Sequence, residues 1–217
     1  MRILLLSILM LLAVPVSAFV PEVIVQKSLL DITAIKDPVL AQTFYGDLVD
    51  FPHTYQIIAT EPFHLFLQIK VPDIESSTNN ISGIIIKEPA GKGRVEEIAR
   101  LKGKDASWES TYEWLSMDAY RNGPSFEKDL GPGTYRIEVS TPDNREKYVL
   151  VVGTREEMAL GYFETVRRLV DIKAFSGKSR LRVVESPLVF VPLLSIGGLI
   201  TFWYRRRVSR LGSGILK

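Results

Sequence analysis

The feature that most constrains this chain is a run of 18 residues without a charged side chain, residues 187–204. A helix rises about 1.5 Å per residue, so this run would be roughly 27 Å long and would match the hydrocarbon core of a bilayer. Trp203 and Tyr204 close the run, where membrane helices carry aromatic residues, and three arginines at 205–207 follow directly. A buried helix of a soluble protein does not normally end on three arginines. The sequence therefore predicts a transmembrane helix over residues 187–204.

A second apolar run, at the N-terminus, has the pattern of a secretory signal peptide. Arg2 precedes an aliphatic stretch over residues 3–16, and small residues follow it. We expect residues 1–18 to be a signal peptide that is cleaved after export, with an uncleaved anchor helix as the alternative. In either case the signal sends the following residues across the membrane. The short basic tail, residues 205–217, is then cytoplasmic.

The composition excludes several classes of protein. The chain contains no cysteine, which excludes a disulfide scaffold, thiol catalysis, Cys-ligated zinc and iron–sulfur clusters. Its 27 basic residues are nearly balanced by 25 acidic ones. This balance argues against a nucleic-acid partner, because nucleic-acid-binding proteins normally carry a basic stripe.

Residues 19–153 alternate apolar and polar side chains with the period of half-buried strands. In the clearest strand, five apolar side chains share one face: Phe63, Leu65, Leu67, Ile69 and Val71. Turn-forming residues separate seven such runs, at residues 42–46, 53–60, 63–71, 84–86, 95–101, 133–139 and 147–152. Residues 107–122 are expected to form a short helix or a long loop. We therefore predict a mainly β protein: an antiparallel, jelly-roll-like β-sandwich over residues 19–153, followed by an amphipathic helix and one C-terminal transmembrane helix.

One segment carries a resemblance to a known family. Residues 131–139 read GPGTYRIEV and residues 147–152 read KYVLVV. Together they resemble the last two strands of bacterial pre-peptidase C-terminal domains, with a match over residues 129–153 and an expected hairpin between the two strands. The resemblance implies a secreted jelly-roll accessory domain without catalytic residues of its own.

Residues 154–176 are expected to form an amphipathic juxtamembrane helix, joined to the span by a linker at residues 177–186. Thr154 and Glu157 have the spacing of a capping box. Apolar side chains at three- and four-residue spacing predict one stripe, a possible interaction surface: Met158, Tyr162, Phe163, Val166, Leu169 and Val170. The stripe fits against the sandwich, on the outer membrane surface, or on another membrane protein, and the sequence leaves this choice open.

No motif assigns a catalytic, cofactor or metal site. His53 and His64 fall on two different predicted strands, and each is expected to be an exposed strand histidine rather than a ligand or base acting with Glu61. Ser125 and Lys128 have the spacing found in some acyl enzymes but lack the companion motifs. The sequence therefore predicts a protein that is not an enzyme and binds no cofactor.

The function predicted is that of a single-pass, membrane-anchored, extracytoplasmic β-sandwich, a non-catalytic binding or structural module at the cell surface or envelope. The expected partners are the lipid bilayer and another membrane or envelope protein or a glycan. Gly197 and Thr201 in the span leave a small surface where a second helix can approach closely. The alternatives are an accessory subunit of a larger membrane complex and a hydrolase with an unrecognised site.

Overall fold

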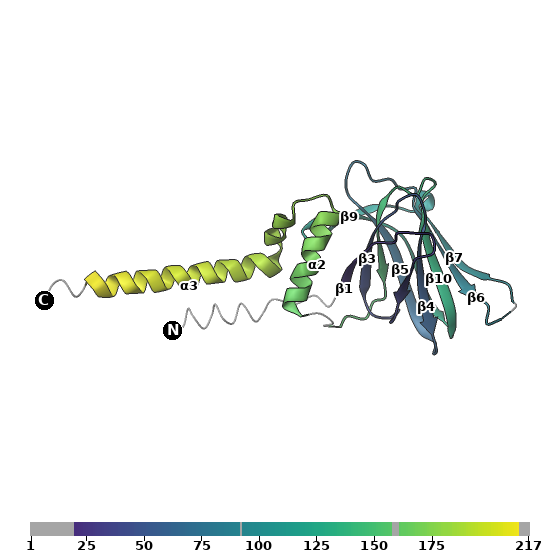
Figure 1. Cartoon of the computed structure of the whole chain (residues 1–217), viewed down its shortest axis with the longest axis horizontal. Coiled ribbons are helices and arrows are strands. Elements are labelled where there is room, and N and C mark those ends of the chain that lie inside the picture. Colours follow the sequence, from purple (N-terminus) through teal and green to yellow (C-terminus); the bar gives the residue numbers. More distant parts are fainter. Residues whose placement is uncertain (1–19, 92, 158–160, 213–217) are drawn as a thin grey trace.

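The protein is a β-sandwich followed by helices, and it is described here from a computed structural model that covers residues 20–91, 93–157 and 161–212. Figure 1 shows two sheets packed face to face and a long helix that projects away from them. The fold class predicted from the alternation of side chains is confirmed. The predicted signal segment, residues 1–18, lies outside the described residues.

The two sheets have six and five strands. The six-stranded sheet has the order β1 (Val20–Ile24), β3 (Gln42–Asp47), β11 (Lys147–Val152), β5 (Phe63–Pro72), β9 (Asp118–Leu130) and β8 (Glu109–Glu113). The five-stranded sheet has the order β2 (Ile32–Ile35), β4 (His53–Ala59), β10 (Gly133–Ser140), β6 (Ser82–Glu88) and β7 (Glu96–Lys102). The expectation of a fully antiparallel sandwich is wrong at two edges, because β1 pairs with β3, and β2 with β4, in parallel.

The main core lies between the sheets and is built by the predicted alternation. On β5, the side chains of Leu65, Leu67, Ile69 and Val71 are at most 1% exposed. The intervening positions of β5 are only partly buried, because they point to the outer face of the six-stranded sheet. Tyr135 and Ile137 on β10 meet this row from the other sheet.

Residues 107–122 form neither a helix nor a loop. Most of them build β8 and the start of β9, which pair in an antiparallel hairpin. β8 lies at the edge of its sheet, and four of its five residues are exposed. An edge strand that is exposed on both faces needs no apolar alternation, which is why its sequence does not reveal it.

The segment that resembles the pre-peptidase C-terminal domain is not a hairpin. β10 belongs to the five-stranded sheet and β11 to the six-stranded sheet, so residues 141–146 cross from one sheet to the other. The crossing turn contains Asn144 at a φ of 48°. Both strands face the same core from opposite sides, and an alternating sequence looks the same in a hairpin and in this arrangement.

The amphipathic helix begins later than the predicted residue 154, whereas the apolar helix begins at the predicted residue 187. α2 spans Tyr162–Phe175, a 3-10 helix η2 spans Arg180–Glu185 in the predicted linker, and α3 spans Pro187–Gly212; a further short turn, η1, spans Gly103–Asp105. The predicted capping box does not start a helix, because the backbone of Arg155 pairs with that of Val39 and Ala41. The Glu157 carboxylate lies 2.9 Å from the Arg155 guanidinium.

Candidate functional site

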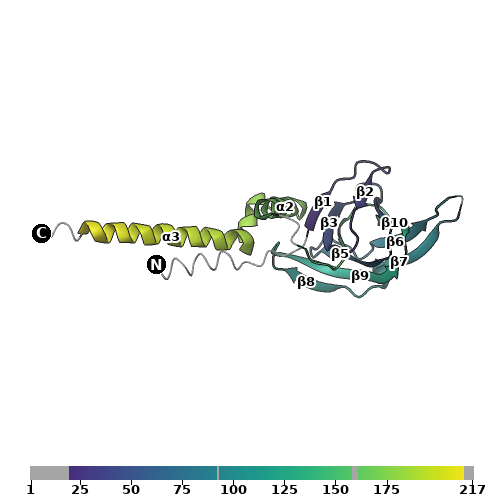
Figure 2. The ribbon, with the colours of Figure 1, turned by 90° about the horizontal axis from the view of Figure 1, so that it is seen from below.

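The junction between the sandwich and α3 is the most elaborate feature of the molecule outside the main core. α2 lies across the outer face of the six-stranded sheet, beside β1 (Figure 2). A second hydrophobic cluster fills this interface, formed by Tyr45, Leu115, Tyr120, Val149, Leu169, Ile172, Phe175 and Leu188. The ring of Tyr45 packs edge-on against those of Phe175, at 5.5 Å, and Tyr120, at 6.2 Å. The sequence left three positions open for the apolar face of this helix: the sandwich, the membrane surface or another membrane protein. In the structure, the apolar face of α2 packs against the sandwich.

This packing buries some residues of the predicted apolar stripe and leaves others exposed. Leu169 is 1% exposed and Val166 packs against the second cluster, whereas Phe163 is 85% exposed. Tyr162 and Val170 are intermediate between these, and Met158 lies outside the described residues. The buried face of α2 is centred on Thr165, Leu169 and Ile172, so Phe163 points the other way. Gly197 and Thr201 lie on exposed turns of α3, away from α2.

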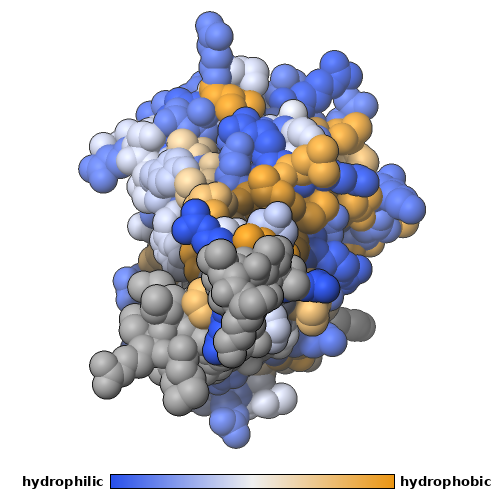
Figure 3. Space-filling model, turned by 90° about the vertical axis from the view of Figure 1, so that its left-hand side faces the viewer, coloured by the Kyte–Doolittle hydropathy of each residue, from blue (hydrophilic) through white to orange (hydrophobic). Residues whose placement is uncertain are grey.

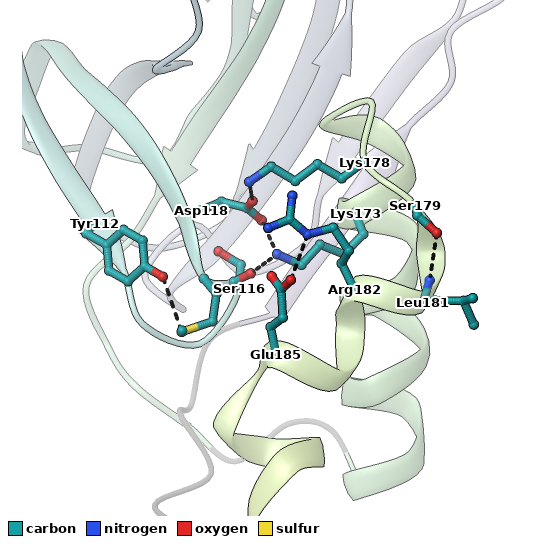
Figure 4. Close-up of polar contacts among 10 residues, drawn as sticks. Tyr112, Ser116, Asp118, Lys173, Lys178, Ser179, Leu181, Arg182 and Glu185 are labelled. Carbon is teal, nitrogen blue, oxygen red and sulfur yellow. Dashed lines mark hydrogen bonds and ion pairs between the residues drawn. The ribbon is translucent and has the colours of Figure 1, made fainter.

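A buried ion pair joins α2 to the sheet. The Lys173 ammonium lies 3.0 Å from the Asp118 carboxylate, and the two side chains are 1% and 3% exposed. Lys173 also donates to the Ser116 carbonyl, and Lys178 donates to the second carboxylate oxygen of Asp118 (Figure 4). Removing an ammonium from water costs several kcal/mol unless it is paired and hydrogen-bonded, and here both conditions hold. No sequence pattern indicates this pair, because a lysine on an amphipathic helix normally marks its solvated side.

Polar contacts continue from this ion pair to the start of α3. The Arg182 guanidinium lies 2.8 Å from the Glu185 carboxylate on η2 (Figure 4). The Tyr162 hydroxyl donates to the Leu188 carbonyl at 3.0 Å. Leu188 is itself buried in the second cluster. The sandwich is therefore packed directly against the first turn of α3.

Beyond that first turn, α3 is almost uncovered by the rest of the protein. The stretch Pro187–Val208 is long and apolar enough to cross a membrane, and 6% of its apolar stretch is buried against the rest of the protein. Several large side chains along it are half exposed or more, including Phe190, Leu194, Ile200 and Trp203. A core helix of a soluble protein would be covered instead.

The two histidines have opposite surroundings. The expectation that His53 is exposed is wrong: its side chain is buried in the main core, where Nδ1 lies 2.9 Å from the Tyr148 hydroxyl. That hydroxyl lies 2.7 Å from the hydroxyl of Tyr55. Burial lowers the pKa of His53 and raises the pKa of both tyrosines. The three groups stay neutral and sealed from solvent, which fits packing rather than chemistry.

The ring of Tyr148 explains a glycine on the neighbouring strand. Gly46 stands opposite Tyr148 in the sheet, and a Cβ at Gly46 would lie 2.5 Å from the tyrosine ring. The tyrosine can reach His53 and Tyr55 because this position carries no side chain.

His64 is an exposed strand histidine, as predicted. Its Nδ1 lies 2.7 Å from the Asp129 carboxylate and its Nε2 lies 2.9 Å from the Glu127 carboxylate. A ring with both nitrogens on carboxylates donates twice, which requires the imidazolium form. Accordingly, the hydrogen bonds to Asp129 and then to Glu127 raise the pKa of His64. Ser125 and Lys128 lie on the same strand, β9.

Comparisons with known proteins give a structural similarity without a sequence match. No protein-family model matches the chain, and no curated protein matches it. Among solved structures, the fold is similar to the 1.0 Å crystal structure of the pre-peptidase C-terminal domain of a collagenase from Bacillus anthracis. The identity is 12% and the TM-score 0.35, over 56% of this chain and 93% of that chain. This is the type of domain that residues 129–153 resemble.

The buried ion pair generates a first prediction. Asp118→Ala leaves the buried Lys173 ammonium without a carboxylate partner, so the free energy of unfolding should fall by about 3–5 kcal/mol. Lys173→Met should cost less, because Lys178 still neutralises Asp118. Urea unfolding of the full chain in mild detergent measures both. Arg182→Gln, which breaks an exposed pair, is the control and should unfold like the unsubstituted protein. Equal unfolding midpoints for Asp118→Ala and Arg182→Gln would contradict the role given to the buried pair.

The His64 bridge generates a second prediction. Because the folded state raises the pKa of His64 above its ordinary value of 6.5, its stabilising effect is complete below that pH and disappears as the pH rises through the folded value. His64→Gln should therefore lower the melting temperature at about pH 5.5 and leave it unchanged at about pH 9. Thermal unfolding at both pH values measures this difference. If His64→Gln lowered the melting temperature equally at both pH values, the charge of the imidazole ring would contribute nothing to stability.

Proposed function

We propose that this protein is a single-pass membrane protein that holds a non-catalytic β-sandwich on the extracytoplasmic side. One observation carries the proposal: beyond the buried Leu188, α3 leaves the sandwich with most of its apolar side chains uncovered as far as Val208. Exposed apolar surface costs about 25 cal/mol per Å² in water, and a bilayer removes that cost along the whole helix. The arginines at 205–207 follow the apolar stretch, as at the end of a membrane span.

The orientation follows from the N-terminal pattern. A signal segment at residues 1–18 directs the sandwich across the membrane, and the tail at residues 205–217 stays in the cytoplasm. The basic side chains of that tail resist translocation.

In the described part of the chain, the surroundings of the reactive side chains fit a binding or structural role. The ring of His53 is sealed in the core, and Lys173 is occupied by Asp118. His64 is held between two carboxylates on an exposed strand. None of these three arrangements offers an accessible base beside a cavity, which a hydrolase would need. The surfaces left for a partner, such as an envelope protein or a glycan, are the loops and edges of the sandwich.

Labelling of introduced cysteines tests this topology without background, because the chain has no cysteine of its own. Ile58, 67% exposed on the five-stranded sheet, reports the sandwich, and Ser209 reports the tail. A membrane-impermeant maleimide added to intact cells or spheroplasts should label Ile58→Cys and spare Ser209→Cys. After permeabilisation both should be labelled. The reverse pattern in intact cells would refute the proposed orientation.

A second candidate function is that of an accessory subunit of a membrane complex. It is favoured by the surface that the small residues Gly197 and Thr201 form on α3. A Cβ at Gly197 would meet nothing within 4 Å, and the Thr201 hydroxyl bonds back to the Gly197 carbonyl, so this side of the helix is smooth. If another helix packs there, Gly197→Leu should abolish copurification of that partner from mild detergent. Leu194→Ile, which keeps the volume of an exposed neighbour, should preserve it. A chain that purifies alone in every case would exclude the subunit function.

A further inference from the structure

Three exposed apolar side chains surround the point where α3 begins. Phe163 is 85% exposed in the first turn of α2, Leu181 is 79% exposed on η2, and Trp114 is 45% exposed in the turn between β8 and β9. They come from three elements, and Trp114 is far from the other two in the sequence. Single exposed apolar residues are ordinary, but a group gathered around one point marks an interaction surface.

The residues next to each of the three connect it to the first turn of α3. Tyr162, whose ring lies 5.3 Å from that of Phe163, donates to the Leu188 carbonyl. Leu115, the neighbour of Trp114, shares the second cluster with Leu188. η2 carries Leu181 and leads into α3 through the buried Ser186.

The arrangement of the elements gives this surface a direction. Figures 1 and 2 show α2 and the short helical turns that lead into α3 on the side of the sandwich from which α3 departs, and Figure 2 shows the end of β8 on the same side. In Figure 1, α2 runs across the direction of α3, and so along the plane of a membrane that α3 crosses. Figure 3 looks onto this side and shows hydrophobic surface interspersed with hydrophilic groups.

The charges of the same elements suit a lipid surface. Residues 162–185 contain six basic and three acidic side chains, and of the basic ones only Lys173 is fully buried, against Asp118. Arg167 and Arg180 are exposed there. Aromatic and aliphatic side chains next to arginines and lysines are typical of segments that lie in the headgroup region, where anionic lipids attract the bases.

We propose that Phe163, Leu181 and Trp114 form a seating surface that inserts into the headgroup region of the bilayer, so that the sandwich rests on the membrane rather than standing on a free stalk. The inference rests on the proposed function, because it requires α3 to span. If hydrocarbon begins near Pro187, then Leu181 lies within about 12 Å of it, at a rise of ~2 Å per residue in a 3-10 helix. Interfacial helices bury their apolar faces about 5–10 Å into the boundary between headgroups and acyl chains.

Fluorescent labelling at single cysteines tests the seating in the full chain. An environment-sensitive dye is attached to Phe163→Cys, Leu181→Cys or Trp114→Cys, and the protein is placed in vesicles of phosphatidylcholine mixed with phosphatidylglycerol. Nitroxide-labelled lipid should quench all three dyes several-fold more strongly than a dye at Ile58→Cys, on the far sheet. Thr201→Cys, within the proposed span, is the positive control.

The outcomes separate the two proposals. If the dye at residue 201 is quenched and those at 163, 181 and 114 match residue 58, the seating is wrong and the anchor stands. If the dye at residue 201 is not quenched, the anchor and the seating are both wrong. Phe163 and Leu181 are the most exposed of the three, so their substitution should leave the melting temperature in detergent unchanged. Unchanged melting together with strong quenching supports the seating surface.

Discussion

The packing of α2 on the outer face of the six-stranded sheet determines how the rest of the molecule is arranged. Without it, Tyr45, Tyr120 and Val149 would present an apolar face to water, and α3 would be joined to the sandwich by a free chain. With it, the second cluster continues to Leu188, in the first turn of α3. The sandwich, the connecting helices and the start of the apolar helix thus share one continuous packed region.

The ion pair within this interface contributes orientation more than stability. An apolar residue in place of each charge would often stabilise such an interface equally well. A buried carboxylate that needs two ammonium groups, however, accepts only the placement of α2 that brings Lys173 and Lys178 to Asp118 together. Apolar packing alone tolerates sliding and rotation, whereas an uncompensated buried charge does not. The specific placement of α2 is therefore best explained by the ion pair.

Features that depend on the pattern along one segment were predictable, and those that depend on which segments meet were not. The alternation on β5 predicted its buried face, and the uncharged run predicted the exposed helix. The crossing of β10 and β11 between sheets escaped prediction, because alternation identifies the buried face of a strand but not its neighbour. His53 and Lys173 escaped for a related reason: a polar side chain is buried only when distant residues, here Tyr148 and Asp118, supply its hydrogen bonds. The edge strand β8 carries no alternation to detect.

The order of elements along the chain has a consequence for biosynthesis. The sheet closes once β11 has emerged, yet its outer face is still bare at that moment, because the helix that covers it comes afterwards. A chain exported from its N-terminal end would thus pass through a state in which both sheets have formed but the apolar outer face of the six-stranded sheet is still exposed. Release into bulk solvent at that stage would favour aggregation through this face. Continued attachment to the export machinery would instead keep this face close to α2, which covers it. In such a chain, the stretch that emerges after β11 would also be the one that completes folding.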